Sequence, residues 1–252
     1  MTMQSPVLPA DPATPFIYTG RHNLRIMSGM SHYNRWIYET IAPYIGRNLL
    51  ETGCGNGNIT RLLVKHRGLT RYVGVDASVE FCREQQRDTS FAPGVSCEFR
   101  AMDLQDDSLL QLSSSRFDSI VCLNVLEHVA KDQLLLDRFK NLLSPAGQVI
   151  LQVPAFQFLY GTIDEIDGHY RRYTRATLFP KLQHAGLRPT HSFYFNLLGI
   201  PAWVWHSKIR KLKTHTEMEL TWWDKAVPLL QRLETLMRPP IGLSLFVIAE
   251  SS

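Results

Sequence analysis

Short apolar runs alternate with amphipathic stretches through the middle of this chain. The runs with a strand-like pattern cover residues 49–52, 72–76, 95–100, 117–123 and 148–153. Residues 132–143 place leucines and a phenylalanine at the spacing of one helix face, and Ser-Pro-Ala-Gly at 144–147 ends that helix. Strands that alternate with helices in this way predict an α/β core with a parallel sheet over residues 47–155.

The C-terminal part of the chain, residues 156–252, first continues this pattern and then departs from it. A helix is expected over 177–185, and alternation over 190–196 and 243–249 predicts two more strands. About 45 residues separate these two strands, far more than the roughly two to five of a hairpin loop. This insert is rich in tryptophan, so residues 197–240 are expected to form a helical cap over a substrate pocket.

The N-terminal part divides at residue 27. Four prolines and no periodicity over residues 1–15 predict a mobile tail that extends through residues 1–27. Residues 28–46 have helical spacing, with Met30, Tyr33 and Ile37 on one face. A helix is therefore expected immediately before the first strand.

A glycine-rich turn follows the first expected strand. Glu51 precedes Gly53, Gly55 and Gly57, which stand at every second position, and the second strand ends on Asp76. A strand, a glycine turn and a helix let backbone amides approach a ligand, and a carboxylate after the next strand is placed to bind ribose hydroxyls. The pattern predicts a cofactor that contains a nucleoside.

Two cofactors compete for this turn. A dinucleotide-binding turn has the pattern G-x-G-x-x-G, and its third glycine would fall at Asn58. The spacing E-x-G-x-G-x-G, with Asp76 downstream, instead resembles the first two motifs of the class I S-adenosylmethionine-dependent methyltransferases. Asp103-Leu104 after the third strand and Asn124–His128 after the fourth continue the resemblance in order, over roughly residues 45–155.

This resemblance implies a Rossmann-like, doubly wound sheet of seven strands with the last strand antiparallel. It implies a single methyltransferase domain over 28–252, with a lid helix at 28–46, a cofactor-binding core at 47–155, and sheet completion plus cap at 156–252. S-adenosylmethionine is the implied cofactor, with Glu51 and the glycines at its methionine part, Asp76 at its ribose and Asp103 at its adenine. The expected cofactor-binding residues are Glu51, Gly53, Cys54, Gly55, Gly57, Asp76, Ala77, Asp103, Leu104 and Asn124.

Composition narrows the class of protein further. With 252 residues, of which 44% are hydrophobic, the chain is long enough to bury a large core. Its apolar stretches near 193–205 are interrupted by Asn196 and Pro201, so no membrane span is expected. The four cysteines lack C-x-x-C spacing, which predicts neither a zinc site nor a disulfide framework. A net charge of +4 and no signal-like N-terminus favour a cytoplasmic enzyme without a nucleic-acid partner.

Two histidines are the candidate catalytic bases. An acceptor hydroxyl or protonated amine has to lose a proton, and histidine titrates near neutral pH. His128 follows the fourth strand and His169 lies in the loop after the fifth, so both are expected at the carboxyl-end edge of the sheet. The alternative for His128 is an orienting role at the start of its helix.

Metal-assisted transfer is the weaker alternative. Some relatives bind a divalent cation through a Glu-x-x-Glu-His cluster, whose first position here is Asn124. Glu127 and His128 would remain, with His169 as a third ligand. Because asparagine is a poorer ligand for a hard cation than a carboxylate, we expect no metal.

The candidate acceptor-binding residues are Tyr170, Arg171, Arg172 and Trp203. A guanidinium group offers a planar fork for a carboxylate or phosphate, although pairing with Asp164, Glu165 or Asp167 is the alternative. Residues 203–213 alternate aromatic and aliphatic side chains with basic ones. Such a stretch fits either a cap helix packed on the core or a basic amphipathic helix on an anionic membrane.

These patterns together predict methyl transfer from S-adenosylmethionine to a small-molecule or lipid-like acceptor, with oxygen as the favoured atom. Peripheral membrane contact is an option, and nothing in the sequence specifies an oligomeric state. Two rival functions remain. One is a nicotinamide-dependent oxidoreductase, disfavoured by Asn58 and Asp103, and the other is a catalytically silent scaffold of the same fold.

Overall fold

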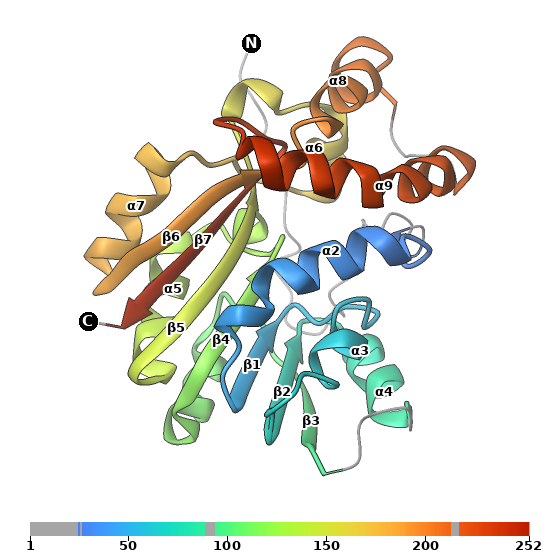
Figure 1. Ribbon diagram of the computed structural model, residues 1–252. Coiled ribbons are helices and arrows are strands. Elements are labelled where there is room, and N and C mark those ends of the chain that lie inside the picture. Colours follow the sequence, from blue (N-terminus) through green and yellow to red (C-terminus); the bar gives the residue numbers. More distant parts are fainter. Residues whose placement is uncertain (1–24, 26, 89–93, 213–216, 252) are drawn as a thin grey trace.

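A mixed sheet of seven strands forms the centre of the molecule (Figure 1). The computed structural model describes residues 25, 27–88, 94–212 and 217–251, so nearly all of the predicted tail lies outside the described residues. The strands are β1 (Asn48–Thr52), β2 (Arg71–Asp76), β3 (Ser96–Ala101), β4 (Phe117–Leu123), β5 (Leu143–Pro154), β6 (Leu187–Phe195) and β7 (Ser244–Ser251), in the order β3-β2-β1-β4-β5-β7-β6. Strands β1 to β5 pair in parallel, whereas β7 runs antiparallel between β5 and β6. This order confirms the predicted doubly wound fold with an antiparallel last strand.

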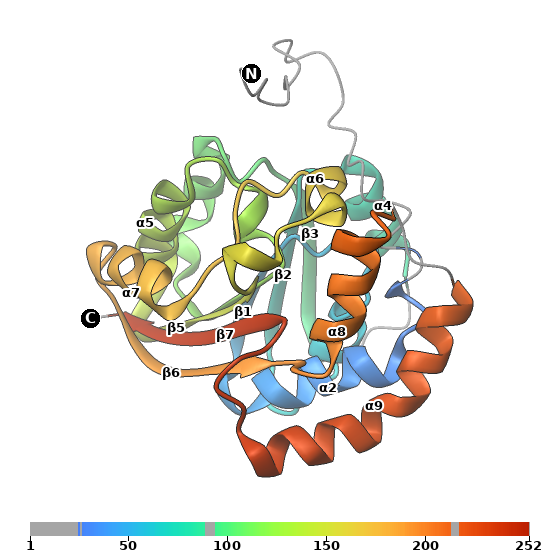
Figure 2. The ribbon, with the colours of Figure 1, turned by 90° about the horizontal axis from the view of Figure 1, so that it is seen from above.

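Helices cover both faces of the sheet (Figure 2). They are α2 (Ser31–Ile41), α3 (Thr60–Leu63), α4 (Val79–Arg87), α5 (Asp132–Leu142), α6 (Thr162–Asp167), α7 (Arg175–His184), α8 (Gly199–Trp203) and α9 (Glu217–Met237). On one face, Leu135 of α5 and Leu182 of α7 are buried in one hydrophobic cluster. On the other face, Ile41 of α2 and Leu63 of α3 belong to a second cluster. The sheet is thus buried between two cores, as a mostly parallel sheet requires.

Two strands are longer than the sequence pattern predicts. β5 begins at Leu143, because the chain pairs with the start of β4 at Phe117 as soon as α5 ends. β6 begins at Leu187 and includes Pro189, next to a register irregularity. Proline is tolerated there because β6 is an edge strand and the ladder loses no central hydrogen bond.

The predicted lid and cap are both helical and lie together. α2 is shorter than the predicted range 28–46 and is followed by a 3-10 turn at Ala42–Tyr44. In the insert between β6 and β7, α8 continues into a π-helical turn at Val204–Ile209, and α9 packs beside α2 (Figures 1 and 2). Among the described residues, no helix is both long enough and apolar enough to cross a membrane.

Asp224 of α9 joins the cap to the lid. Its Oδ1 accepts a hydrogen bond from the backbone N–H of Tyr33 (2.9 Å), and its Oδ2 accepts one from the N–H of His32 (3.2 Å). These amides belong to the first turn of α2, which has no intrahelical partners for them, and Met30 supplies no side-chain cap. Asp224 of α9 therefore accepts the hydrogen bonds that normally go to an N-cap side chain of α2.

We expect Asp224→Ala to lower the free energy of unfolding by about 1–2 kcal/mol, the usual effect of losing a helix cap. The change leaves the first-turn amides of α2 without their acceptor. Urea unfolding of the variant and the wild type measures the difference. Asp224→Asn is the matched control because it keeps one acceptor oxygen and should lose less. Identical midpoints for the alanine variant and the wild type would contradict the capping role.

Candidate active site

A cavity of about 860 Å³ lies where the parallel strands end. Its lining comes from the loops after β1 to β5, from the lid helix α2 and from the cap. Ligands of open α/β sheets bind at this edge, and small-molecule sites have volumes of about 300–1,000 Å³. The cavity therefore has the position and size of a site for a cofactor together with an acceptor.

The glycine turn after β1 forms one wall of this cavity. Gly53, Gly55 and Gly57 have φ angles of +71°, +50° and +81°, a backbone region that side chains disfavour. A Cβ atom at Gly53 would collide with Val125, and one at Gly57 would collide with Gln85. Gly53, Cys54 and Gly55 line the cavity, whereas Gly57 does not. Backbone conformation and packing therefore account for the glycines at 53 and 57.

Glu51 is buried beneath the turn and also lines the cavity. Its Oε2 accepts hydrogen bonds from the hydroxyl groups of Thr60 (2.7 Å) and Tyr72. Burial raises the pKa of Glu51 to about 7, although the two hydroxyl donors favour the charged form. The side chain thus anchors the turn from below and presents a carboxyl group that titrates near neutral pH.

The remaining cofactor-binding candidates, Asp76, Ala77, Asp103, Leu104 and Asn124, also line the cavity. The carboxylate of Asp76, at the end of β2, accepts hydrogen bonds from the backbone N–H groups of Gly55 (2.9 Å) and Ser78 (2.8 Å). These bonds fix its orientation at the cavity wall. A carboxylate has about four acceptor positions, so its chemistry suits a pair of ribose hydroxyls. Asp103 is exposed at the rim.

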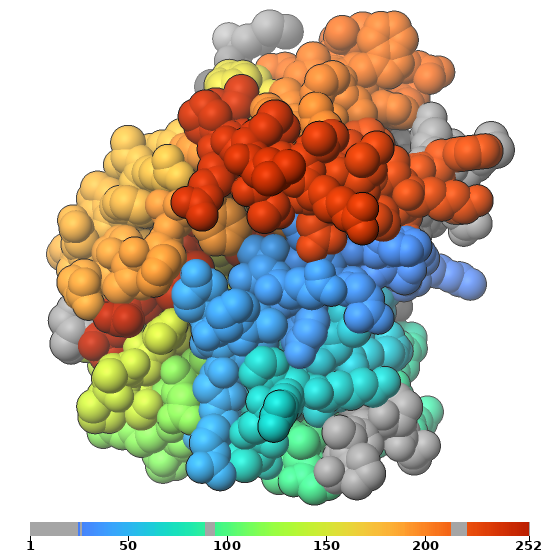
Figure 3. Space-filling model, in the orientation of Figure 1, coloured from blue at the N-terminus to red at the C-terminus, as the bar shows by residue number. Residues whose placement is uncertain are grey.

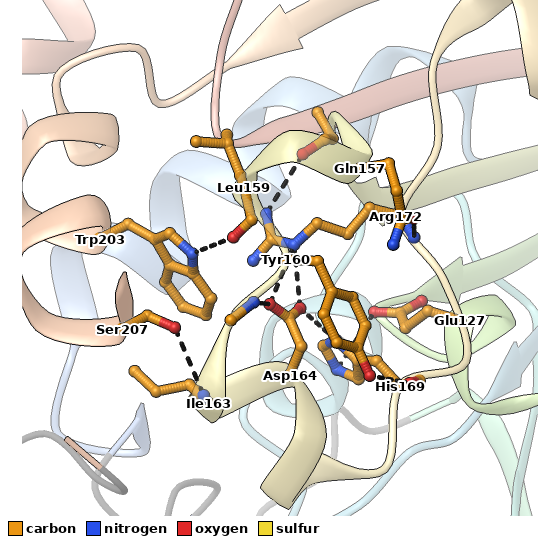
Figure 4. Close-up of polar contacts among 12 residues, drawn as sticks. Glu127, Gln157, Leu159, Tyr160, Ile163, Asp164, His169, Arg172, Trp203 and Ser207 are labelled. Atoms are coloured by element: carbon orange, nitrogen blue, oxygen red, sulfur yellow. Dashed lines mark hydrogen bonds and ion pairs between the residues drawn. The ribbon is translucent and has the colours of Figure 1, made fainter. Parts of the chain in front are cut away.

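The two candidate bases, His128 and His169, line the same cavity as the buried carboxyl group of Glu127. Figure 4 shows Glu127 beside His169. The rings of His128 and His169 pack edge to face with centroids 4.6 Å apart. Glu127 is fully buried, and its Oε1 lies 4.0 Å from Nε2 of His169. Neither carboxyl oxygen of Glu127 has a hydrogen-bond partner among the described residues. A buried carboxyl group without a protein partner is rare and calls for a ligand, a water molecule or a catalytic role to explain it.

The surroundings give the two histidines opposite protonation behaviour. Burial and then the neighbouring His169 lower the pKa of His128 to about 3, so this ring is neutral. Burial alone would lower the pKa of His169, but the hydrogen bond to Asp164 and the charge of Glu127 raise it above its ordinary value. Burial raises the pKa of Glu127 to about 7. The charge of each group, His169 and Glu127, therefore influences the pKa of the other across 4.0 Å.

Arg172 and Asp164 form an ion pair that holds His169 in place (Figure 4). The Arg172 Nε lies 2.9 and 3.1 Å from the two carboxylate oxygens of Asp164, and both side chains are buried. Oδ1 of Asp164 also lies 2.7 Å from Nδ1 of His169. Arg172 stacks on the Trp203 ring, with 4.5 Å from its guanidinium carbon to the ring centroid. Asp164 thus bonds to Arg172 and to the candidate base His169 at the same time.

The four candidate acceptor ligands do not all reach the cavity: Arg172 and Trp203 line it, and Tyr170 and Arg171 do not. Arg171 instead bonds to Asp132, at 2.9 Å from its carboxylate. The indole N–H of Trp203 donates to the backbone oxygen of Leu159 (2.9 Å). The guanidinium group of Arg172 is paired with Asp164, and the indole N–H of Trp203 is also bonded within the protein. Both side chains therefore shape the wall of the cavity, and their polar groups are already occupied.

The contact between Asp164 and the candidate base His169 is one that the sequence did not predict. Asp164 lies in α6, five residues before His169. Gly168 ends α6 with φ +77°, and this turns the chain so that the N–H of His169 donates to the backbone oxygen of Asp164 (2.9 Å). A glycine directly after a short acidic helix and before a histidine was the available signal.

The three groups of the metal alternative do lie together. The ligand atoms of Glu127, His128 and His169 are within 4.8 Å of one another. Arg172 is a cation close enough to this cluster that its charge lowers the pKa of Glu127 and favours the ionised form. The spacing would permit a metal ion, whereas the charge of Arg172 opposes one.

Comparisons with known proteins place the chain among methyltransferases. Residues 50–149 match a family model described as a methyltransferase domain. The chain is 31% identical over 127 residues to a tRNA U34 carboxymethyltransferase of Alteromonas mediterranea, covering 46% of this chain and 36% of that protein. It is 25% identical over 158 residues to a ubiquinone biosynthesis O-methyltransferase of Xylella fastidiosa, covering 58% and 62%. The structure of the N-methyltransferase NodS from Bradyrhizobium japonicum, in complex with S-adenosyl-L-homocysteine, is similar with a TM-score of 0.53 and 15% identity, over 92% of this chain and 87% of that one.

The fold, the cavity and these matches define the class: the chain belongs to the class I S-adenosylmethionine-dependent methyltransferases. S-adenosylmethionine is the cofactor of this class. The wall built from the glycine turn and Asp76 fits it, because that wall offers oriented acceptors beside a cavity of sufficient volume. The chain spans 36% and 62% of the lengths of the two curated relatives, so neither relative fixes an acceptor for it.

Proposed function

We propose that this chain transfers a methyl group from S-adenosylmethionine to a hydroxyl group of a small, partly apolar acceptor. The observation that carries the proposal is the His169–Asp164 pair, which lies in the same cavity as the glycine turn and Asp76. The sulfonium of the cofactor supplies an electrophilic methyl group. The protein has mainly to align the acceptor oxygen and to remove its proton, which a rigid wall and a general base accomplish.

The cofactor-binding roles follow from chemistry and position. Asp76 would accept the ribose hydroxyl groups, since its carboxylate is fixed at the wall by two backbone bonds. Asp103, at the exposed rim, would accept the adenine amino group beside the apolar Leu104. Glu51 and the glycine turn would lie at the methionine part. Burial raises the pKa of Glu51 to about 7, and the ammonium group of the cofactor would favour its ionised form.

His169 is better suited than His128 to act as the base. Asp164 accepts the proton of Nδ1, which leaves Nε2 of neutral His169 as the basic nitrogen. A raised pKa strengthens that nitrogen as a base. His128, with a pKa lowered to about 3, is a weak base and would serve by packing against the His169 ring.

The acceptor would be lipid-like, because much of the remaining lining is apolar. The side chains of Met27, Met30, Ile37, Ala202, Trp203, Trp222 and Trp223 line the cavity from the lid and the cap. The similarity to a ubiquinone biosynthesis O-methyltransferase supports an apolar acceptor that is methylated on oxygen. A lipid-like acceptor is met at a membrane surface, so peripheral membrane contact is part of this proposal.

We expect the purified chain to bind S-adenosylmethionine and not NAD when both are titrated by calorimetry. The prediction rests on Asn58 at the position of the third dinucleotide glycine and on the Asp76 wall. Asp76→Ala should weaken S-adenosylmethionine binding without unfolding the protein, and Asp88→Ala, a change outside the cavity lining, is the matched control. Preferred binding of NAD would overturn the cofactor assignment.

The same preparation tests methyl transfer itself. Incubation with S-adenosylmethionine and a cell-extract lipid fraction should produce a species heavier by one methylene unit, detected by mass spectrometry. A chelator should leave this activity intact, because Arg172 and Asn124 both argue against a metal. Cofactor binding without any methylated product across lipid and aqueous fractions would favour the silent scaffold. Loss of product on chelation, with recovery on adding a divalent cation, would favour the metal alternative.

A further inference from the structure

The outward face of α9 is apolar, although a surface helix ordinarily turns polar residues to solvent. Trp222, Leu229, Leu233 and Leu236 have exposed fractions of 70%, 63%, 40% and 84%. Their spacing of seven, four and three residues places them on one side of the helix, together with the exposed Ala226. We call these five residues the α9 stripe. Figure 3 shows α9 as a ridge across this face of the molecule. An exposed apolar surface of this kind marks an interaction site.

Over residues 221–237, the part of α9 whose side chains are described, the exposed charged residues are cations. Lys225 and Arg232 are exposed and lie along one edge of the stripe by their helical spacing. The two acidic residues within 221–237, Asp224 and Glu234, are both buried. Each accepts backbone hydrogen bonds inside the protein, Asp224 from α2 and Glu234 from the N–H of Asn196. The cations of this segment are exposed and its acidic residues are buried, which predicts an anionic partner for this face.

The stripe begins at the mouth of the cavity. Trp222 is largely exposed and yet lines the cavity together with Trp223. α8 and its π-helical continuation lie close to this end of α9 (Figures 1 and 2). Their exposed residues include Trp205 and Ile209, with Lys208 beside them. Exposed apolar and basic residues of this segment therefore lie near the Trp222 end of the stripe, where the stripe meets the cavity.

We propose that the α9 stripe docks on the surface of an anionic lipid bilayer. The leucines and Trp222 would enter the headgroup boundary, and Lys225 and Arg232 would contact lipid phosphates. A second copy of the chain fits less well, because docking two such stripes brings cations together with no exposed carboxylate on either stripe, as far as side chains are described. Glu39 of α2 accepts from Gln231 on another side of the helix.

This surface deepens the proposed function by naming where a lipid-like acceptor enters. Docking itself is independent of methyl transfer, so it is measured without cofactor or acceptor. The wild-type chain should sediment with vesicles made of equal parts phosphatidylcholine and phosphatidylglycerol, and much less with phosphatidylcholine alone. Raising the salt concentration should release it, because the electrostatic part is screened over about 10 Å at 0.1 M.

The decisive variant is Leu229→Glu/Leu233→Glu, which puts two carboxylates at the centre of the stripe. We expect it to lower vesicle binding by at least about tenfold, since each added charge repels anionic lipid and removes apolar contact. Lys225→Ala and Arg232→Ala should each weaken binding by about fivefold, which corresponds to about 1 kcal/mol per cation. Leu134→Glu is the matched control, because Leu134 is an exposed leucine of α5 on the opposite face of the sheet.

Calorimetry with S-adenosylmethionine accompanies every variant and should give wild-type affinity. A folded double variant that binds the mixed vesicles as well as the wild type overturns the proposal. A wild-type chain that does not sediment with these vesicles also overturns it. A wild-type dimer in sedimentation velocity that the double variant converts to monomer would also overturn it, since the stripe would then be an interface between copies. Failure of cofactor binding in the wild type would instead count against the proposed function alone.

Discussion

Replacement of His169 by glutamine is expected to lower kcat by about 10²–10⁴-fold, the range that general base catalysis contributes. Glutamine keeps a donor for the Asp164 carboxylate but has no basic nitrogen at the Nε2 position. The affinity for S-adenosylmethionine should be unchanged, which calorimetry on the same variant measures. His128→Gln is the comparison, and it should lose far less activity because the pKa of His128 is already about 3. Full turnover by the His169 variant would refute the assignment of the base.

The pH dependence follows from the same contact. His169 has to be neutral to accept a proton, and its pKa is raised above the ordinary value of 6.5. The rate should therefore fall as the pH decreases through that raised pKa. Asp164, Glu127 and Asp167 raise this pKa, and burial lowers it, with His128 and Arg172 also nearby. Glu127→Gln removes one negative charge, so the acidic limb should move to lower pH. Because His169 and Glu127 interact, the apparent values belong to the pair.

Arg172→Met is expected to lower the free energy of unfolding by about 3–5 kcal/mol, the usual effect of removing one partner of a buried ion pair. Both side chains are almost fully buried, so the change leaves the Asp164 carboxylate without its main counter-ion. Methionine retains much of the length that packs against Trp203, and the loss therefore reports the charge. Urea denaturation followed by circular dichroism gives the two midpoints and slopes.

A second variant separates charge from packing. Arg172→Met/Asp164→Leu removes both charges and should recover much of the stability, because replacing a whole buried ion pair by apolar groups is often nearly neutral. It should not recover activity, since His169 loses its Asp164 partner. Arg171→Met is the matched surface-side control, as Arg171 is partly exposed and bonds to Asp132. An Arg172 variant as stable as the Arg171 variant would contradict the anchoring role.

The central strands could be predicted because the pattern that produces each of them lies within a few consecutive residues. Each central strand is a short apolar run bounded by polar or turn residues, and the helix over 132–143 has clear periodicity. The start of β5 was less predictable, since Leu143 continues the apolar spacing of α5 and only pairing with Phe117 assigns it to the sheet. The antiparallel direction of β7 came from resemblance to the methyltransferase family, because a strand pattern carries no direction.

The site was predicted less completely. The glycines and Asp76 were identified through their spacing, and the structure brings their turn and the two histidines to one cavity. The partners of the charged side chains were not identifiable, because the segment 161–173 offers several acids for each cation. Arg172 pairs with the buried Asp164 of this segment, whereas Arg171 pairs with Asp132, a buried acid that lies outside the segment. Sequence spacing contains no information on which side chain faces inward in an irregular loop.

The hydrogen bonds from α2 to Asp224 have a consequence for the opening of the cavity. α2 lines the cavity beside the glycine turn, and α9 carries the tryptophans at its mouth. A movement of α2 that admits the cofactor must either break the bonds to Asp224 or carry α9 with it. Where these bonds hold, a movement of α2 would be transmitted to Trp222 and Trp223 of α9, so the two sides of the cavity would open together.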